Sequence, residues 1–186
     1  RDWSSDVCSS DLDGAPVTGD LESVQMNAER EIPLQYRECV ADLLEHDRVQ
    51  KLEQYIQHYH TTRLQHSLNV SYYSYLICKK LGWDYRSAAR AGLLHDLFFY
   101  DWRAPKKLRG NHAIWHPLVA YDNARKICEL NEIEKDAIVK HMWPCNIIPP
   151  KYKESYVITF VDKYCAVAET FQPYYLKVKQ FRKVHA

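Results

Sequence analysis

The spacing of apolar residues constrains the fold of this 186-residue chain more than any other feature. From about Tyr36 onwards, apolar side chains recur every three or four residues, which is the repeat of one face of an α-helix. No stretch shows sustained alternation of apolar and polar residues, and no Asn-Gly or Asp-Gly pair marks a tight hairpin. The pattern therefore predicts an all-α protein, a single-domain helical bundle of about six main helices.

Capping residues indicate where several of these helices begin and end. Thr61 or Thr62 is expected to cap the second helix, and Gly82 suits the position just after its last turn. Asp84 is a cap for the third helix, and Asn131 begins a capping-box pattern at the fifth. The expected helices are residues 36–60, 62–81, 85–97, 117–129, 131–141 and 153–171, with Pro117 in the first turn of the fourth.

The two ends of the chain need separate treatment. Residues 2–12 are the in-frame translation of a widely used sequencing adapter, so we interpret residues 1–12 as an artefact and exclude them from the fold. Residues 13–35 are polar and are expected to be loosely ordered, and residues 36–171 should form the helical domain. Residues 172–186 form a basic C-terminal tail of weak periodicity.

Charge and cysteine content exclude several classes of protein. The net charge is +1, so we expect no membrane association and no stable binding to nucleic acid. No run approaches the length of apolar sequence that spans a bilayer. Five cysteines remain beyond the adapter segment, widely spaced and without a Cys-x-x-Cys pair. This pattern favours reduced thiols and a cytoplasmic location.

Polar side chains interrupt the apolar faces of four expected helices. Projection at 3.6 residues per turn places His66 in a row with Val70, Tyr73 and Ile77, and His95 beside a run of small residues. His141 and Asp162 occupy equivalent positions in the fifth and sixth helices. A buried carboxylate without a partner costs several kcal/mol or becomes neutral. One or two shared divalent cations would satisfy all four groups.

The order His66, His95-Asp96 and Asp162 resembles the HD-domain metal-dependent phosphohydrolase superfamily over about residues 60–170. The match includes the spacing in "RLQHSLNVSYYSYLICKKLGWDYRSAARAGLLHDL" and the later "FVDKY". In addition, "HAIWHP" and "KHMWP" resemble the extra histidines of HD proteins that hold two metals. The signature of the cyclic-di-GMP phosphodiesterase branch is absent, so that substrate is not implied.

The resemblance implies a metal site with named ligands. His66, His95, Asp96 and Asp162 would hold the first ion, with Asp96 bridging to a second ion. His116 and His141 would complete the site of the second ion. The alternative is that they only cap a helix start and a helix end. One or two divalent ions are expected, with Mn, Fe, Co, Ni, Zn and Mg all open. Four other histidines are interpreted as ordinary surface or packing residues: His46, His58, His60 and His185.

The implied activity is hydrolysis of a small phosphorylated substrate, a phosphomonoester or phosphodiester and potentially a nucleotide, by a metal-activated water. Asp96 and His95 are the expected catalytic residues. His112 is expected to contact a metal ligand from behind or to contact the substrate, rather than to bind metal itself. The complete set of expected substrate-binding residues is Arg63, Lys106, Lys107, Arg109, His112 and Lys163.

Two alternatives stay open at the level of sequence. A two-metal HD site also suits a di-iron oxygenase, which would be recognised by iron content and O₂ consumption. A non-catalytic module that binds metal or nucleotide would bind saturably without turnover.

Overall fold

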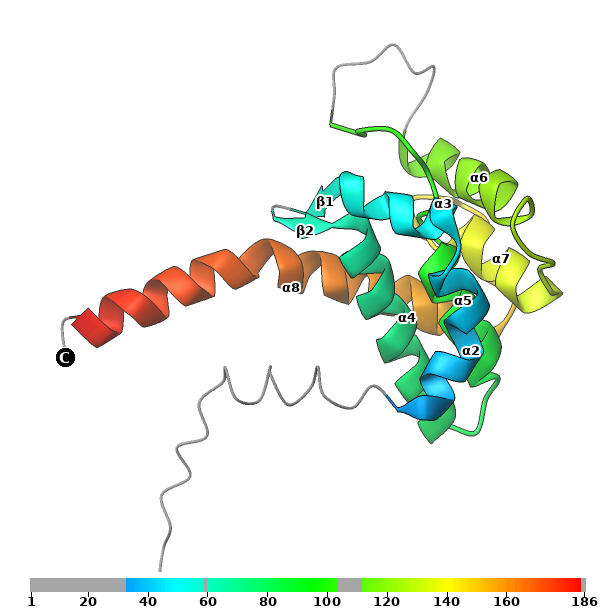
Figure 1. Cartoon of the computed structure of the whole chain (residues 1–186), viewed down its shortest axis with the longest axis horizontal. Helices are drawn as coiled ribbons and strands as arrows, with labels where there is room; N and C mark the ends of the chain where they lie inside the picture. Colours follow the sequence, from blue (N-terminus) through cyan, green and yellow to red (C-terminus); the bar gives the residue numbers. More distant parts are fainter. Residues whose placement is uncertain (1–32, 59, 104–111, 185–186) are drawn as a thin grey trace, which may run out of the picture. The chain divides into compact units, whose positions relative to one another are not determined.

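Helices dominate the computed structural model, which describes residues 33–58, 60–103 and 112–184. The all-α prediction is confirmed, and a two-stranded hairpin is the only sheet in the described residues. The first elements are α2 (Leu34–Leu44), α3 (Asp47–Gln50), the 3₁₀ helix η1 (Lys51–Gln54), β1 (Ile56–His58) and β2 (Thr61–Thr62). They are followed by α4 (Arg63–Lys80), α5 (Tyr85–Leu94), α6 (His112–Ala124), α7 (Glu132–Lys140) and α8 (Lys153–Val184) (Figure 1).

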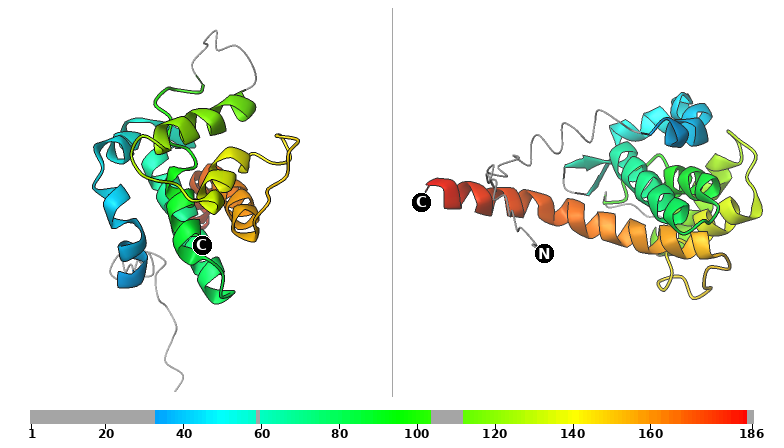
Figure 2. Two further views of the ribbon diagram at one scale, coloured as in Figure 1. Left: turned by 90° about the vertical axis from the view of Figure 1, so that its right-hand side faces the viewer. Right: turned by 90° about the horizontal axis from the view of Figure 1, so that it is seen from below.

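Helices α4 and α5 lie at the centre of the bundle. They pack on each other, α8 lies along both, and α7 contacts α5 and α8 (Figure 2). Helix α2 covers α5, and α6 packs on α7. The core between them is built from fully buried side chains such as Val40, Leu43, Val70, Leu94 and Ile158. Burial of this apolar surface drives the helices together.

The predicted caps are present. The side chains of Thr62 and Asp84 accept hydrogen bonds from the N–H three residues further on, at 3.1 and 2.9 Å. Asn131 and Glu134 form a reciprocal capping box at the start of α7. Gly82 has φ +66°, the left-handed conformation that ends a helix and favours glycine.

A close approach of α4 and α5 depends on Gly92. A methyl group at this position would lie 2.7 Å from the Cα atom of Ser71 and 2.9 Å from its backbone nitrogen. The small residue therefore lets the backbones of the two helices nearly touch. This contact brings His95, three residues later, toward His66 on α4.

The first predicted helix is wrong beyond Leu44. The ring of His46 accepts a hydrogen bond from the N–H of Arg48 at 3.1 Å and starts α3 as a separate helix. The chain then turns through η1 into β1, which pairs antiparallel with β2. Thr61 and Thr62 are β-branched and favour the extended backbone of this hairpin. Its two short strands are too brief to show an alternating pattern.

Three further helices differ from the prediction at their ends. Helix α5 ends at Leu94 rather than at residue 97, with His95 as its C-cap. Helix α6 begins at His112 rather than Pro117, and the stacked rings of His112 and His116, 4.5 Å apart, support its first turn. It ends at Ala124, before the expected residue 129. Helix α8 continues to Val184, well past residue 171, so the backbone of much of the expected tail is helical. The loosely ordered N-terminal segment lies almost entirely outside the described residues.

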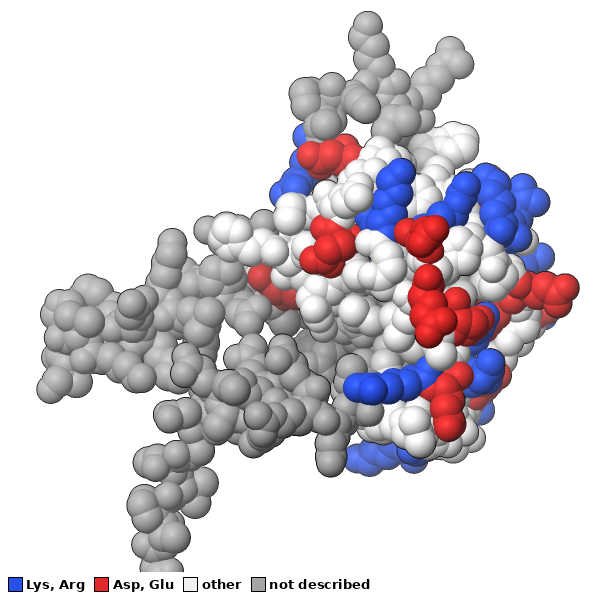
Figure 3. Space-filling view, in the orientation of Figure 1, with Lys and Arg blue, Asp and Glu red and all other residues white. Residues whose placement is uncertain are grey.

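Surface charge, helix hydropathy and the cysteines are the features that relate to binding partners and to the cellular compartment. Figure 3 shows Lys and Arg interspersed with Asp and Glu over the described part of one face. No helix in the described ranges is both long and apolar enough to cross a membrane. Free thiols occur at Cys39, Cys78, Cys128, Cys145 and Cys165.

Candidate metal centre

Six polar side chains from five helices or their ends meet inside the bundle, and all of them are buried or nearly so. Their order along the chain is His66 on α4, His95 at the end of α5, Asp96, His116 on α6, His141 at the end of α7 and Asp162 on α8. Helices α5 and α7 thus each end with a histidine that belongs to this cluster. The structure brings together all six residues that the sequence named as candidate ligands, in two groups.

The first group is His66, His95 and Asp162. The Oδ1 atom of Asp162 lies 3.2 Å from Nε2 of His66 and 3.6 Å from Nε2 of His95. One carboxylate oxygen therefore faces two imidazole nitrogens from two other helices. His95 also approaches Asp96, with its Nε2 atom 3.7 Å from Oδ2.

The second group is Asp96, His116 and His141. The Oδ1 atom of Asp96 lies 3.2 Å from Nε2 of His116 and 3.6 Å from Nε2 of His141. The two histidine Nε2 atoms are 2.8 Å apart. Because Asp96 contacts His95 through Oδ2 and this group through Oδ1, its carboxylate lies between the two groups.

Backbone carbonyls fix the orientation of three of these rings. The Nδ1 atoms of His95, His116 and His141 lie 2.7, 2.9 and 2.8 Å from carbonyl oxygens three or four residues earlier. A carbonyl oxygen only accepts, so each Nδ1 carries the hydrogen. In the neutral ring, Nε2 then presents an unprotonated lone pair to the centre of the site.

This donor set fits divalent cations. With Nδ1 protonated in both rings, the Nε2 atoms of His116 and His141 are two acceptors facing each other at 2.8 Å. His95 Nε2 and Asp96 Oδ1 are buried without a hydrogen-bond partner in the described residues. Ligands bound to Zn²⁺ at ~2.0–2.2 Å are themselves separated by roughly 3–3.5 Å, close to the spacings found here. Mixed imidazole and carboxylate donors also suit Mn²⁺ and Fe²⁺.

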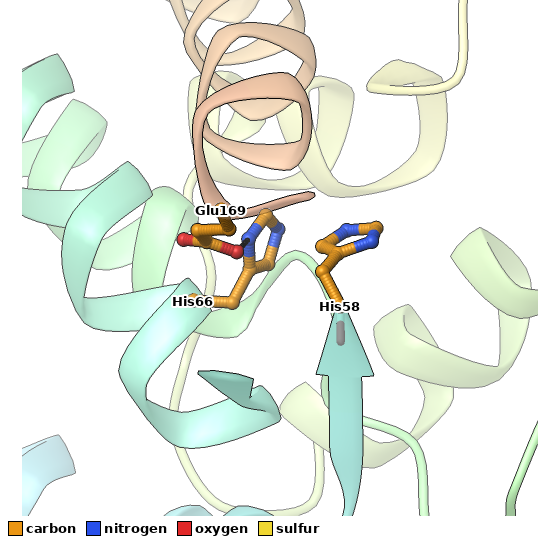
Figure 4. Close-up of side chains that lie close together, drawn as sticks. All are labelled: His58, His66 and Glu169. Atoms are coloured by element: carbon orange, nitrogen blue, oxygen red, sulfur yellow. Dashed lines mark hydrogen bonds and ion pairs between the residues drawn. The ribbon is translucent and has the colours of Figure 1, made fainter. Parts of the chain in front are cut away.

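His66 is held from behind by Glu169. Its Nδ1 atom donates to Oε2 of Glu169 at 2.9 Å (Figure 4). Asn69 donates to the other oxygen of Glu169 at 2.8 Å. His58, at the end of β1, lies beside His66 with ring centroids 5.0 Å apart. A carboxylate that orients a ligand histidine is a common feature of metal sites. Glu169 and His58 therefore both contact His66 from outside the first group.

The protonation states follow from these contacts. Burial lowers the pKa of His66, but hydrogen bonds to Asp162 and Glu169 outweigh it and raise the pKa to about 10. Burial raises the pKa of Asp96 and Asp162, yet the facing histidines hold both well below their usual range. Burial and the neighbouring histidines lower the pKa of His141 to about 3. The site thus combines ionised carboxylates with a neutral His141, the forms that bind metal.

Arg63, one of the expected substrate-binding residues, lies inside the protein rather than at its surface. Arg63 is completely buried, and its guanidinium lies 3.6 Å from the centroid of the Phe98 ring. It donates to the carbonyl of Phe98 at 2.7 Å and to the side chain of Gln57 at 2.8 Å. Gln57 in turn donates to Oδ2 of Asp96. Arg63 thus supports Asp96 through Gln57, which lies on β1.

The other expected substrate-binding residues have different surroundings. His112 stacks on His116 and on Trp102, and its backbone carbonyl accepts the His116 hydrogen bond, so it lies behind a candidate ligand. Lys163 is partly exposed beside Asp162 and donates to the carbonyl of His141 at 2.9 Å. Lys106, Lys107 and Arg109 lie outside the described residues.

Sequence reasoning missed Glu169, His58 and Gln57. Glu169 had a usable signal, because it follows Asp162 by seven residues and so lies on the same face of α8. His58 was interpreted as an ordinary residue, and Gln57 was not singled out. Both belong to a hairpin that the helical pattern concealed. The His46 interpretation agrees with its role as the cap of α3.

Comparison with protein families gives a match to the model described as HD domain, over residues 63–166. The matched region is more than half of the chain and contains all six residues of the two groups. The comparison with curated proteins gave no match, and neither did that with solved structures.

Proposed function

Because the chain belongs to the HD-domain family, we propose that it is a metal-dependent phosphohydrolase acting on a phosphomonoester or phosphodiester such as a nucleotide. The observation that carries this proposal is the opposed pair of Nε2 atoms of His116 and His141, 2.8 Å apart and next to an unpartnered oxygen of Asp96. Two lone pairs at this distance repel each other unless a proton or a metal ion lies between them. A second group of the same chemistry adjoins this one.

The residues of the chain have distinct tasks in this proposal. His66, His95 and Asp162 would hold one ion and His116 and His141 the other, and the Asp96 carboxylate, which lies between the two groups, would serve both. When bound, such ions lower the pKa of water toward neutrality and offset charge on phosphoryl oxygens. Carbonyls behind three histidines keep the Nε2 lone pairs aimed inward. The network from Arg63 through Gln57 holds the Asp96 carboxylate, and the buried surroundings strengthen these electrostatic interactions.

The partners and compartment are part of the same proposal. We infer a small phosphorylated substrate positioned by basic side chains, of which Lys163 lies beside Asp162. The mixed charges in Figure 3 support a small substrate rather than nucleic acid. The free thiols support a reducing compartment such as the cytoplasm.

The test is hydrolysis of p-nitrophenyl phosphate, its bis-ester and a nucleotide panel with Mn²⁺, Co²⁺, Ni²⁺, Fe²⁺ and Mg²⁺ in turn. His95→Ala and Asp96→Ala should lose metal and activity together, whereas His46→Ala, a histidine outside the site, should keep both. An Asp96→Ala variant with full metal content and full rate rejects the proposal. Iron with O₂ consumption would instead identify a di-iron oxygenase, and nucleotide binding without turnover a binding module.

A further inference from the structure

A row of exposed apolar side chains runs along α8. Phe160, Tyr164, Val167 and Phe171 are 60%, 65%, 58% and 61% exposed. They are separated by four, three and four residues, so they lie on one face of the helix. We call these four residues the α8 seam.

The sequence continues the same spacing beyond the seam. Tyr174, Val178 and Phe181 follow at steps of three, four and three residues, and α8 remains helical to Val184. Over these seven positions of the sequence the steps average 3.5 residues, the repeat of two helices that pack along each other. The pattern therefore indicates a helix partner along much of α8.

Helix α4 widens this apolar surface. Tyr73 and Ile77 are 45% and 40% exposed, and the ring of Tyr73 lies 6.4 Å from that of Tyr164. A surface depression of about 480 Å³ beside the seam is lined by Ile77, Trp83 and Phe160 among others. A partner helix on the seam would thus also contact α4.

The second half of α8 extends away from the helices of the bundle. Figures 1 and 2 show it running on beyond them. Pro173 lies inside this helix and cannot donate the hydrogen bond of its turn, which costs an isolated helix ~3 kcal/mol. Most helical stability in proteins comes from tertiary packing. A helix of this kind is expected to pack against another element.

We propose that a second copy of this chain packs against the α8 seam and forms a homodimer. A two-fold arrangement places the same row of each copy against the other, so one pattern serves both sides. A large aromatic side chain buries ~150–250 Å². Because about three-fifths of each seam side chain is exposed, the four residues offer roughly 400 Å² of apolar surface per copy. This is about half of the ~800 Å² that each partner buries in a standard interface. Tyr73 and Ile77 add to this area, and the heptad pattern of the sequence continues beyond Phe171.

The test is the mass of the full chain in solution by light scattering and sedimentation equilibrium. The wild-type protein should have twice the mass of one chain at micromolar concentration. Phe171→Glu and Tyr164→Glu should each weaken the dimer by about thirtyfold or more, since a charge in the centre of an interface is a hot-spot change. Ile147→Glu makes the same substitution at an exposed apolar residue outside the seam and should leave the dimer intact.

The outcome of this dimer test does not depend on whether the chain is a phosphohydrolase. Circular dichroism and metal content should be unchanged in both seam variants, because neither residue contacts the six candidate ligands. A monomeric wild-type protein overturns the proposal. So does a dimer that Phe171→Glu and Tyr164→Glu leave as tight as before.

Discussion

Replacing Gly92 with alanine tests how the bundle sets the geometry of the candidate metal centre. The added methyl would lie 2.7 Å from the Cα atom of Ser71, whereas carbon atoms pack at ~3.5–4.0 Å. Helices α4 and α5 must therefore separate by roughly 1 Å. Such overpacking costs ~1–3 kcal/mol. The better helix propensity of alanine offsets ~1 kcal/mol of this, so the net loss of stability should be small.

The effect on metal binding should be larger than the effect on stability. His66 lies on α4 and His95 follows α5, so the separation moves one ligand away from the other. Metal sites tolerate only ~0.5 Å of such displacement, and we expect at least tenfold weaker Mn²⁺ affinity by titration calorimetry. Gly82→Ala is the matched control. Its methyl meets no atom within 4 Å, but its left-handed backbone costs ~1–2 kcal/mol, so it should lower the unfolding temperature and leave affinity unchanged. Unchanged affinity in Gly92→Ala, or an equal loss in both variants, refutes the reasoning.

Three further predictions follow, two on Glu169 beside the site and one on a buried ion pair between α5 and α7. Glu169→Gln should weaken metal binding ~10–100-fold by calorimetry, because His66 loses the carboxylate that orients it; an affinity like that of the wild type would count against this role. In the metal-free protein, the raised pKa of His66 stabilises the fold. This stabilisation is complete below pH 6.5, the ordinary pKa of the group, and is lost as the pH rises through about 10. Urea unfolding should therefore show a smaller loss of stability between pH 7 and 10 in Glu169→Gln than in the wild type, and identical slopes would contradict this. Arg90→Met should destabilise the fold by ~3–5 kcal/mol, because buried Glu134, 3.0 Å from Arg90, loses its charge partner, whereas the exposed Arg86→Met should change little.

Local signals in the sequence were sufficient for much of the fold. Caps such as Thr62, Asp84 and Asn131 act through neighbouring backbone N–H groups, so their effect is readable from a few residues. The small residues before His95 likewise predicted a close helix contact, and Gly92 provides it. Helix projection indicated His66, His95, His141 and Asp162, and the resemblance to the HD family added Asp96 and His116.

The features that sequence missed depend on contacts between distant segments. The hairpin of β1 and β2 is too short to show a period, yet it carries Gln57 and His58 to the site. Helix projection also placed Tyr73 and Ile77 on a core face, although both are substantially exposed. Arg63 is buried because its guanidinium finds Gln57, Phe98 and backbone carbonyls far along the chain. No rule based on neighbouring residues anticipates such partners.

Elemental analysis of the purified protein, with calorimetric titration of the metal-free form, tests the central claim most directly. The two groups around Asp96 should hold about two divalent ions per chain. His141→Ala should remove one of them and leave the ion held by His66, His95 and Asp162. A wild-type chain that carries no divalent ion, and takes up none at millimolar Mn²⁺, Fe²⁺ or Zn²⁺, contradicts the account.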